Sequence, residues 1–260
     1  PMLSCAAVGD VTSLRLLLVA GCDVASTGKD GSTGLIVASM MGHEEYVRLL
    51  IARGADLRAK NHEGMTSLHV AAGMGHTGVM KVLLEVDSTL GEEQTNLGET
   101  VALYASESGQ VESLVCLMEV IGRERMRDLM SIHDNQNSGV SHSAAMLGQA
   151  DIMRFVAELC GKKALFSANV NGHTCAHVAA WGGHLDTIKF IHEVCGTEIF
   201  MMKDNSNNLP AIGAAYEQSE EVLEYLGGIG ACPETLPIGG VPYIINGFVS
   251  EDSLLQSIRD

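Results

Sequence analysis

Apolar residues in this chain gather in short runs of two kinds, and the two kinds alternate. The first kind is rich in small side chains and ends near a glycine, as at residues 67–73. The second kind places larger aliphatic side chains at helical spacing, as at Val79, Val82 and Leu83. Polar or glycine-containing segments separate the runs. The pattern therefore predicts pairs of short helices, in which the small residues let the first helix approach its neighbours closely.

The pair of helices belongs to a unit that repeats along the chain. Residues 64–76 nearly recur at residues 172–184. Each unit opens on a turn residue, glycine or asparagine, of the kind that tolerates positive φ. These turn residues are Gly31, Gly64, Gly98, Asn137, Gly172 and Asn207. A single unit cannot bury its apolar face alone, so the sequence predicts an array of stacked units.

The helices have their own start and stop signals. A threonine two residues after the turn predicts an N-cap, whose oxygen accepts a hydrogen bond from the first turn of the helix. The four threonines are Thr33, Thr66, Thr100 and Thr174. The second helix is expected to stop at a glycine, as at Gly54, which opens the sequence Gly-Ala-Asp.

These motifs resemble those of the ankyrin-repeat family, whose pattern is G-x-T-P-L-H-x-A-A-x-x-G-H, an aliphatic helix and then G-A-D. Residues 61–94 and 169–197 match this pattern best. The resemblance implies an all-α fold, a curved ankyrin-repeat solenoid of about seven helix-turn-helix units with β-turn tips, over residues 1–231. The units are expected at about residues 2–27, 28–60, 61–94, 95–132, 133–168, 169–203 and 204–231.

Two places depart from the regular pattern. About five extra residues lie between the fourth and fifth units, around residues 122–128, which carry Arg123, Arg125 and Arg127; we expect the solvated end of a lengthened outer helix there. A patch for an acidic partner segment is the alternative. The next unit has Gly139 where the capping threonine stands elsewhere, so residues 120–145 are expected to open first.

Residues 232–260 are expected to form a tail or a capping segment. Prolines and glycines at residues 233–242 indicate a linker, and a short helix is expected from Ser250 to Ile258. One interpretation is that the tail covers the last repeat, because terminal units need a cap. Others are a linker toward a further domain, or a segment that occupies the groove.

Charge and cysteine usage limit the classes of partner. The chain has 32 acidic and 16 basic residues, a net charge of −16, which argues against nucleic acid or an anionic membrane as the main partner. A basic protein or peptide remains allowed. The seven cysteines are dispersed, which is typical of a reducing compartment, so we expect a cytoplasmic location, with the nucleus as the alternative.

The ten histidines invite a catalytic or metal-binding interpretation, but the register of the repeat explains six of them. Three begin helices and three follow a glycine in the turn between helices; they are His69, His142, His177, His43, His76 and His184. A zinc site at residues 173–177 is disfavoured, since its side chains would point different ways. We therefore expect no catalytic residue, no cofactor and no metal.

The positions that vary on the fixed scaffold are the better candidates for a site. Those after the paired small residues carry methionines and aromatic residues, including the only tryptophan. By the resemblance they line the concave face; the alternative is that they pack between neighbouring inner helices. The candidate partner-binding residues are Met40, Met41, Met74, Met146, Leu147, Trp181 and Tyr216, with His62, Glu63, Asn171 and His173 at the turn tips.

We therefore predict a non-enzymatic scaffold that binds a protein or peptide ligand on its concave face, with Trp181, Met74, Met146 and Tyr216 at the centre. The main alternative is a substrate-recruiting or regulatory ankyrin region of a larger enzyme or signalling protein. A metal-dependent hydrolase is a third interpretation, which metal analysis of the pure protein would test. The sequence does not define an oligomeric state.

Overall fold

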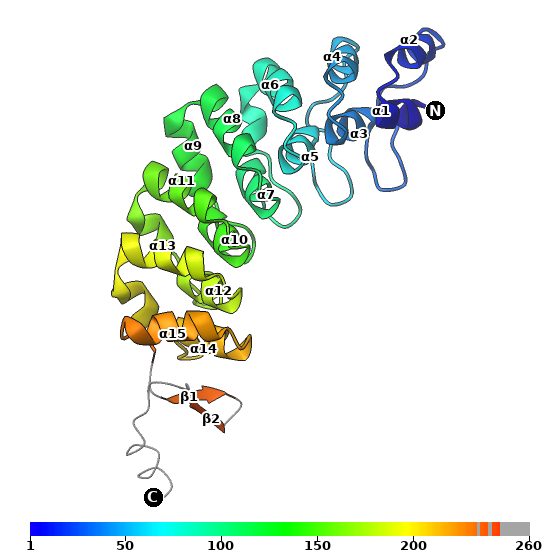
Figure 1. Ribbon diagram of the computed structural model, residues 1–260. Coiled ribbons are helices and arrows are strands. Elements are labelled where there is room, and N and C mark those ends of the chain that lie inside the picture. Colours follow the sequence, from blue (N-terminus) through cyan, green and yellow to red (C-terminus); the bar gives the residue numbers. More distant parts are fainter. Residues whose placement is uncertain (233–234, 239–240, 245–260) are drawn as a thin grey trace, which may run out of the picture. The chain divides into compact units, whose positions relative to one another are not determined.

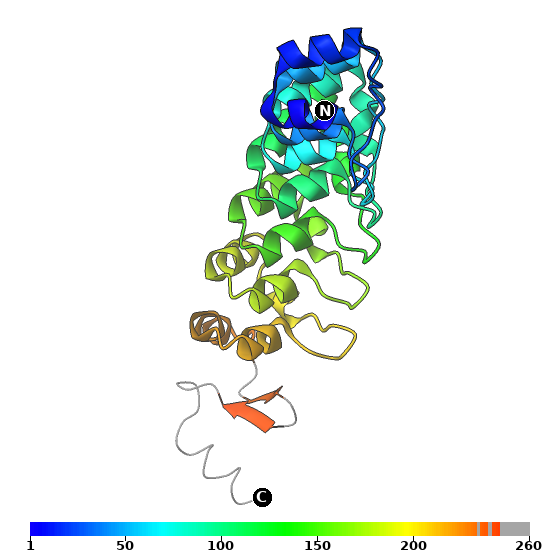
Figure 2. The same ribbon diagram turned by 90° about the vertical axis from the view of Figure 1, so that its right-hand side faces the viewer.

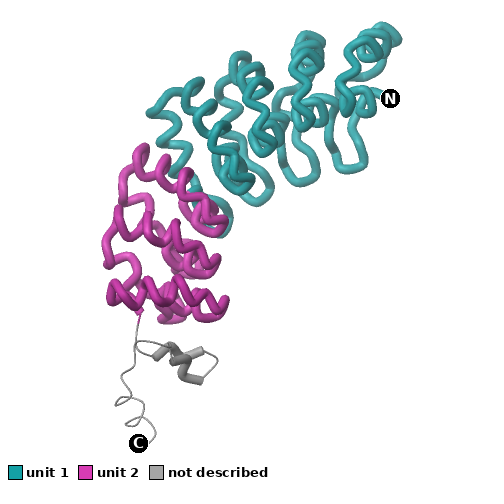
Figure 3. The backbone as a smooth tube through the Cα atoms, in the orientation of Figure 1, with its two compact units in different colours: residues 1–140 teal, residues 141–260 magenta. Residues whose placement is uncertain are grey.

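A computed structural model describes residues 1–232, 235–238 and 241–244. The chain divides into two compact units, residues 1–140 and residues 141–260, which Figure 3 colours separately. Both units consist of helices stacked in layers, and this confirms the predicted all-α repeat architecture.

The first unit contains inner and outer helices that alternate along the chain (Figure 1). Each inner helix packs on the next inner helix, and each outer helix on the next outer helix. The inner helices are α1 (Met2–Val8), α3 (Gly34–Met40), α5 (Ser67–Gly73) and α7 (Val101–Glu107). The outer helices are α2 (Val11–Val19), α4 (Glu44–Ala52), α6 (Thr77–Val86) and α8 (Val111–Ile121).

The second unit repeats this arrangement. Inner helix α12 packs on α14, and outer helix α13 lies between α11 and α15. The inner helices are α10 (Val140–Met146), α12 (Cys175–Trp181) and α14 (Pro210–Tyr216); the outer helices are α11 (Ala150–Cys160), α13 (Leu185–Cys195) and α15 (Glu220–Gly228). Figure 2 shows the turn tips of each unit projecting from one side of its own helices.

The predicted turn and cap residues act as expected. Gly31, Gly64, Gly98 and Gly172 have φ between 80° and 83°, and Asn137 and Asn207 have φ of 57° and 65°. Thr33 and Thr100 accept the backbone N–H of Ile36 and Leu103. The last inner helix lacks a hydroxyl cap at Leu209 and instead has Pro210 at its first position, where the fixed φ of proline favours a helix start.

The inserted residues form a separate helix, so the expected lengthening of an outer helix is wrong. Helix α8 stops at Ile121 because Gly122 has φ 86° and ψ 158°, a conformation that is essentially restricted to glycine. Helix α9 (Arg123–Met130) follows, and its Arg125 is bound to Ser88 and to the Glu92 carboxylate, 2.7 Å away. Arg125 is therefore not simply solvated.

Short third helices also follow three other outer helices. They are 3-10 helices, η1 (Ser88–Glu92), η2 (Lys162–Phe166) and η3 (Thr197–Met201). Gly161 and Gly196 precede η2 and η3 with φ of 78° and 76° and extended ψ, as Gly122 precedes α9. The wider spacing of the later repeats thus reflects an extra helical turn between the outer helix and the next tip.

The expected linker after the last repeat contains a β-hairpin instead. Strands β1 (Thr235–Ile238) and β2 (Val241–Ile244) pair antiparallel, with Ile238 opposite Val241, and β1 lies beside α14. Two apolar runs separated by Gly-Gly are a hairpin signal, which the prolines obscured. The helix expected at residues 250–258 lies outside the described residues. The division between array and tail near residue 231 stays a prediction.

Candidate functional site

The candidate residues at the C-terminal ends of the inner helices, and just after them, are exposed. In the first unit the exposed fractions of Met40, Met41 and Met74 are 37%, 46% and 54%. In the second unit those of Met146, Leu147, Trp181 and Tyr216 are 47%, 47%, 43% and 48%. These side chains are therefore not buried between neighbouring inner helices, which was the alternative.

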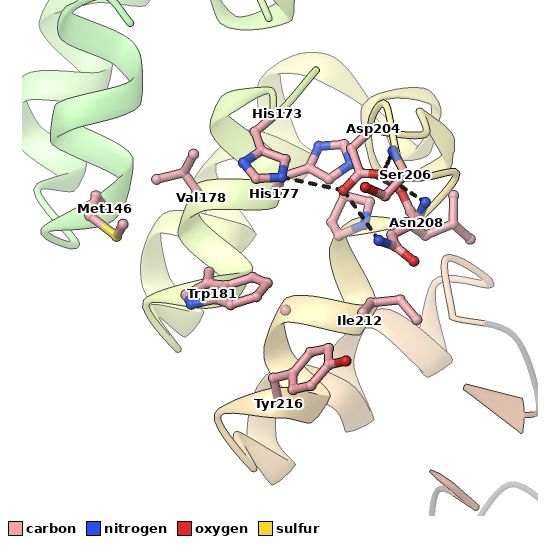
Figure 4. A pocket seen from close by; sticks show the side chains of 13 residues that line it. Met146, His173, His177, Val178, Trp181, Asp204, Ser206, Asn208, Ile212 and Tyr216 are labelled. Carbon is pink, nitrogen blue, oxygen red and sulfur yellow. Dashed lines mark hydrogen bonds and ion pairs between the residues drawn. The ribbon is translucent and has the colours of Figure 1, made fainter. Parts of the chain in front are cut away.

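Two of the exposed aromatic side chains stack on each other. The ring centroids of Trp181 and Tyr216 are 5.6 Å apart, with 26° between the ring planes. Trp181 ends α12 and Tyr216 ends α14, so the packing of these two inner helices brings the rings together (Figure 4). The stack limits the motion of both rings, so a ligand that contacts them loses little side-chain entropy.

A pocket of about 390 Å³ opens beside this stack. Val178, Pro210 and Ile212 add apolar surface to the two rings. The opposite end is polar and contains His173, Asp204, Ser206 and Asn208 (Figure 4). The pocket therefore combines an apolar wall with a few polar groups, which is the usual character of a ligand site.

The missing side chain of Gly213 makes room for Trp181. A Cβ atom at Gly213 would lie 3.0 Å from Trp181 Cε3 and 3.1 Å from the Trp181 backbone nitrogen. In three other inner helices the same register position holds valine, at Val37, Val70 and Val178. This difference was not used in the sequence analysis. A glycine in place of valine, in the inner helix that follows the only tryptophan, is the signal that could have indicated the pocket.

Two histidines and an aspartate define the polar end. His173 Nε2 lies 3.3 Å from Asp204 Oδ2, and the His173 ring stacks on His177 with centroids 5.7 Å apart. His177 Nδ1 accepts the Thr174 N–H, and its Nε2 is 3.3 Å from the Asn208 carbonyl. Burial lowers the pKa of His177 below its usual value, because a charged imidazole would be poorly solvated there.

Hydrogen bonds keep Asp204 acidic. Burial by itself would raise the pKa of this carboxyl, but hydrogen bonds from the backbone N–H groups of Asn208 and Ser206 outweigh it, and the pKa is lowered. Asp204 is therefore ionised at neutral pH. Asp204 was not among the candidate residues.

The structure brings together four of the candidate residues: Met146, His173, Trp181 and Tyr216 all line the pocket. Leu147 and Asn171 belong to the same unit but do not line it. The other candidates, Met40, Met41, Met74, His62 and Glu63, lie in the first unit.

The tip residues of the first unit use their backbone to connect repeats. His62 and Glu63 are exposed. The Asn96 N–H donates to the Glu63 carbonyl, at 3.0 Å, and the Asn96 side chain donates to the His62 carbonyl, at 2.8 Å. A partner at this tip would therefore meet the side chains of His62 and Glu63 rather than these two carbonyls.

The residues weighed as zinc ligands have other contacts. The Cys175 thiol donates to the Leu165 carbonyl at 3.1 Å, and burial raises the pKa of this thiol. Throughout the described part of the chain, no group of three or more His, Cys, Asp or Glu side chains is arranged to hold a metal ion. Within the same residues, every helix is too short or too polar to cross a membrane.

Comparison with known families supports the repeat assignment. Residues 2–94 match the family described as ankyrin repeats, in three copies. No curated protein matches the chain. The pairs of inner and outer helices seen in the matched residues continue through residues 95–231. Ankyrin repeats are generally protein–protein interaction modules, and the fold is generally non-catalytic. Residues 2–94 of this chain therefore belong to the ankyrin-repeat family.

Proposed function

We propose that this protein is a non-catalytic scaffold whose second unit binds an extended segment of a partner protein, with one partner side chain in the Trp181–Tyr216 pocket. The observation that carries the proposal is this pair of exposed, stacked aromatic rings beside a pocket of about 390 Å³. Tryptophan and tyrosine dominate binding energy at protein interfaces, because each removes a large apolar area from water at small entropic cost.

The exposed methionines extend the proposed surface. Met146 lines the pocket, and Leu147 is the next residue on the same exposed stretch. In the first unit, Met40, Met41 and Met74 occupy the same register, and the tip residues His62 and Glu63 are also exposed. Methionine adapts its shape to different partners, so these positions suit contacts around a central aromatic site. Nucleic acid is not proposed as a partner, and the cytoplasmic location stays a prediction.

Selection from a random peptide library displayed on phage tests this proposal with the full chain as bait. Trp181 is the only tryptophan, so its fluorescence reports directly on the pocket. Selected peptides should shift the Trp181 emission and reduce its quenching by acrylamide, because a bound segment shields the ring from water.

The control is Met201→Ala, which removes an exposed apolar side chain of η3 in the same unit, outside the pocket. Peptides that bind the wild-type protein should bind this variant equally well. Failure to recover any peptide that protects Trp181 from acrylamide would contradict the proposed function.

A further inference from the structure

At the polar end of the pocket, the Asp204 carboxylate oxygen Oδ2 can accept a further hydrogen bond. Its Oδ1 accepts two backbone N–H groups, of Ser206 and Asn208, both at 2.8 Å. Among the described residues, its Oδ2 has only two long contacts, 3.3 Å to His173 Nε2 and 3.4 Å to Asn208 Nδ2. Hydrogen bonds to a carboxylate are normally shorter than 3 Å. Oδ2 can therefore accept a stronger hydrogen bond from a ligand.

The negative charge of Asp204 is largely withdrawn from water. Its side chain is 8% exposed. Within the described residues its ion pair is with His173, and no lysine or arginine lines the pocket. Lys203 precedes Asp204 in the sequence but is exposed and is not part of the pocket wall. A ligand that covers the pocket thus covers a carboxylate that no lysine or arginine neutralises.

Most of the described lysines and arginines of the second unit lie outside its inner helices. Helices α10, α12 and α14 contain no lysine or arginine. Four of the basic residues stand instead on outer helices and η2; they are Arg154, Lys162, Lys163 and Lys189. Glu217 follows Tyr216 directly and is exposed. The inner face of this unit is therefore apolar and acidic, which complements a basic ligand.

The shape of the pocket narrows the choice of side chain. Trp181, Pro210 and Ile212 form an apolar wall that leads to the Asp204 end (Figure 4). A purely apolar side chain would pack against the wall but would displace water from Asp204 Oδ2 without replacing the lost hydrogen bond. This loss opposes binding. Lysine and arginine have long methylene stems and a cationic head, so they satisfy both ends.

We propose that the pocket binds a lysine or arginine side chain of the partner, with its stem against Trp181 and Ile212 and its cationic head on Asp204 Oδ2. This inference rests on the proposed function, and it specifies the partner as a segment with a basic residue at its central position. The protein already uses a similar contact internally, because Arg154 Cζ lies 4.7 Å from the ring centroid of Phe190.

The test uses Asp204→Asn together with peptides obtained by the phage selection. Asparagine keeps the turn, since Asn61 and Asn169 accept the same pair of backbone N–H groups in their own tips. The matched control is Asp134→Asn, the same substitution at the same turn position of the first unit, where Asp134 accepts the N–H groups of Gln136 and Ser138. Circular dichroism and thermal melting verify that both variants are folded.

Selected peptides that depend on Trp181 should share a lysine or arginine. Asp204→Asn should weaken their binding at least tenfold, and Asp134→Asn should leave it unchanged. Replacing the shared arginine by citrulline, or the shared lysine by acetyl-lysine, should weaken binding to the wild-type protein similarly. The two losses should not add when combined, because both remove the same contact.

Two results would overturn the inference while the proposed function stands. One is a set of Trp181-dependent peptides without an excess of lysine and arginine over the input library. The other is equal binding of these peptides to the wild-type protein and Asp204→Asn. A failure of the proposed function is recognised separately, because in that case no selected peptide depends on Trp181 at all.

Discussion

At the scale of single residues, the pocket depends on a side chain that is absent. Gly213 lies in the middle of α14, where other inner helices carry valine, and its missing Cβ leaves the space that the Trp181 ring and backbone occupy. The exposed aromatic stack is thus a consequence of two positions, one on each helix.

Replacing Gly213 by valine should close the pocket while the repeat remains folded. The new side chain would displace Trp181, because even a Cβ atom at this position would lie 3.0 Å from Trp181 Cε3. We expect at least tenfold weaker binding of pocket-dependent peptides and a stability loss of about 1–3 kcal/mol, as is usual for overpacking. Gly228→Val is the control, since nothing lies within 4 Å of a Cβ there. Unchanged binding to Gly213→Val would show that the pocket is not used.

A second prediction at this scale concerns Glu107, at the end of α7. Burial, the Glu99 carboxylate and Asp134 raise its pKa to about 7. The folded protein therefore holds this proton more tightly than the unfolded chain, and stability falls as pH rises from about 4.5 through 7. Glu107→Gln should be more stable than the wild type at pH 8 and should lose this advantage at pH 4.

The gain from Glu107→Gln should stay below about 1 kcal/mol, because the side chain is only partly buried and solvent screens much of the repulsion. Urea unfolding at several pH values measures it. Glu112→Gln, a glutamate of α8, provides the same change of charge as a control. A stability difference between Glu107→Gln and wild type that does not vary with pH would refute the assignment.

At the scale of elements, three buried histidines, His69, His142 and His177, join their repeats to the following tip. His69 accepts the Thr66 N–H at Nδ1, and its Nε2 lies 3.3 Å from the Glu99 carbonyl of the following tip. Burial lowers the pKa of His69 to about 4, so the ring is neutral at physiological pH. His177 repeats both contacts in the second unit.

His69→Ala should therefore cost about 2 kcal/mol of stability, since it leaves the buried Thr66 N–H without its acceptor and removes the contact with the Glu99 carbonyl. His62→Ala, at an exposed tip of the same repeat, should change stability by less than about 0.5 kcal/mol. Equilibrium unfolding in urea compares the two variants. Equal stability of both would show that the interrepeat contact contributes nothing.

Elements also show where sequence reasoning succeeds and fails. The caps at Thr33 and Thr66 were predictable, because each depends on residues within one turn of helix. Helix α9 was mispredicted, because its charged residues are equally suited to continuing α8 and only the backbone of Gly122 separates the two. The pocket requires Trp181 and Gly213 to meet across two helices, and the periodicity of a single helix carries no such information.

At the scale of the whole molecule, a repeat array is a series of units with nearest-neighbour contacts, so a poor unit opens first. The sequence predicts that residues 120–145 open first, and the structure narrows the expected segment to residues 131–145. Helix α9 buries Met126 and Leu129 and is held by Arg125, whereas Gly139 supplies no capping hydroxyl. The boundary between the compact units also falls here, after Val140.

Native-state hydrogen exchange should therefore find faster exchange at residues 131–145 than at residues 66–84, where the inner helix α5 begins with a capping box. The comparison is made within the wild-type protein, because a surface substitution such as Ser138→Asp would not report on where the array opens. Equal protection of the two segments would contradict the expected opening.

The most direct test of the binding account is the dissociation constant of a selected peptide for Trp181→Ala, with Met201→Ala as the control. Truncating a central aromatic anchor should cost about 2 kcal/mol or more, which is roughly a thirtyfold increase in the dissociation constant. The account predicts this increase for Trp181→Ala and an unchanged value for Met201→Ala. Equal dissociation constants for wild type and Trp181→Ala, for every selected peptide, would contradict it.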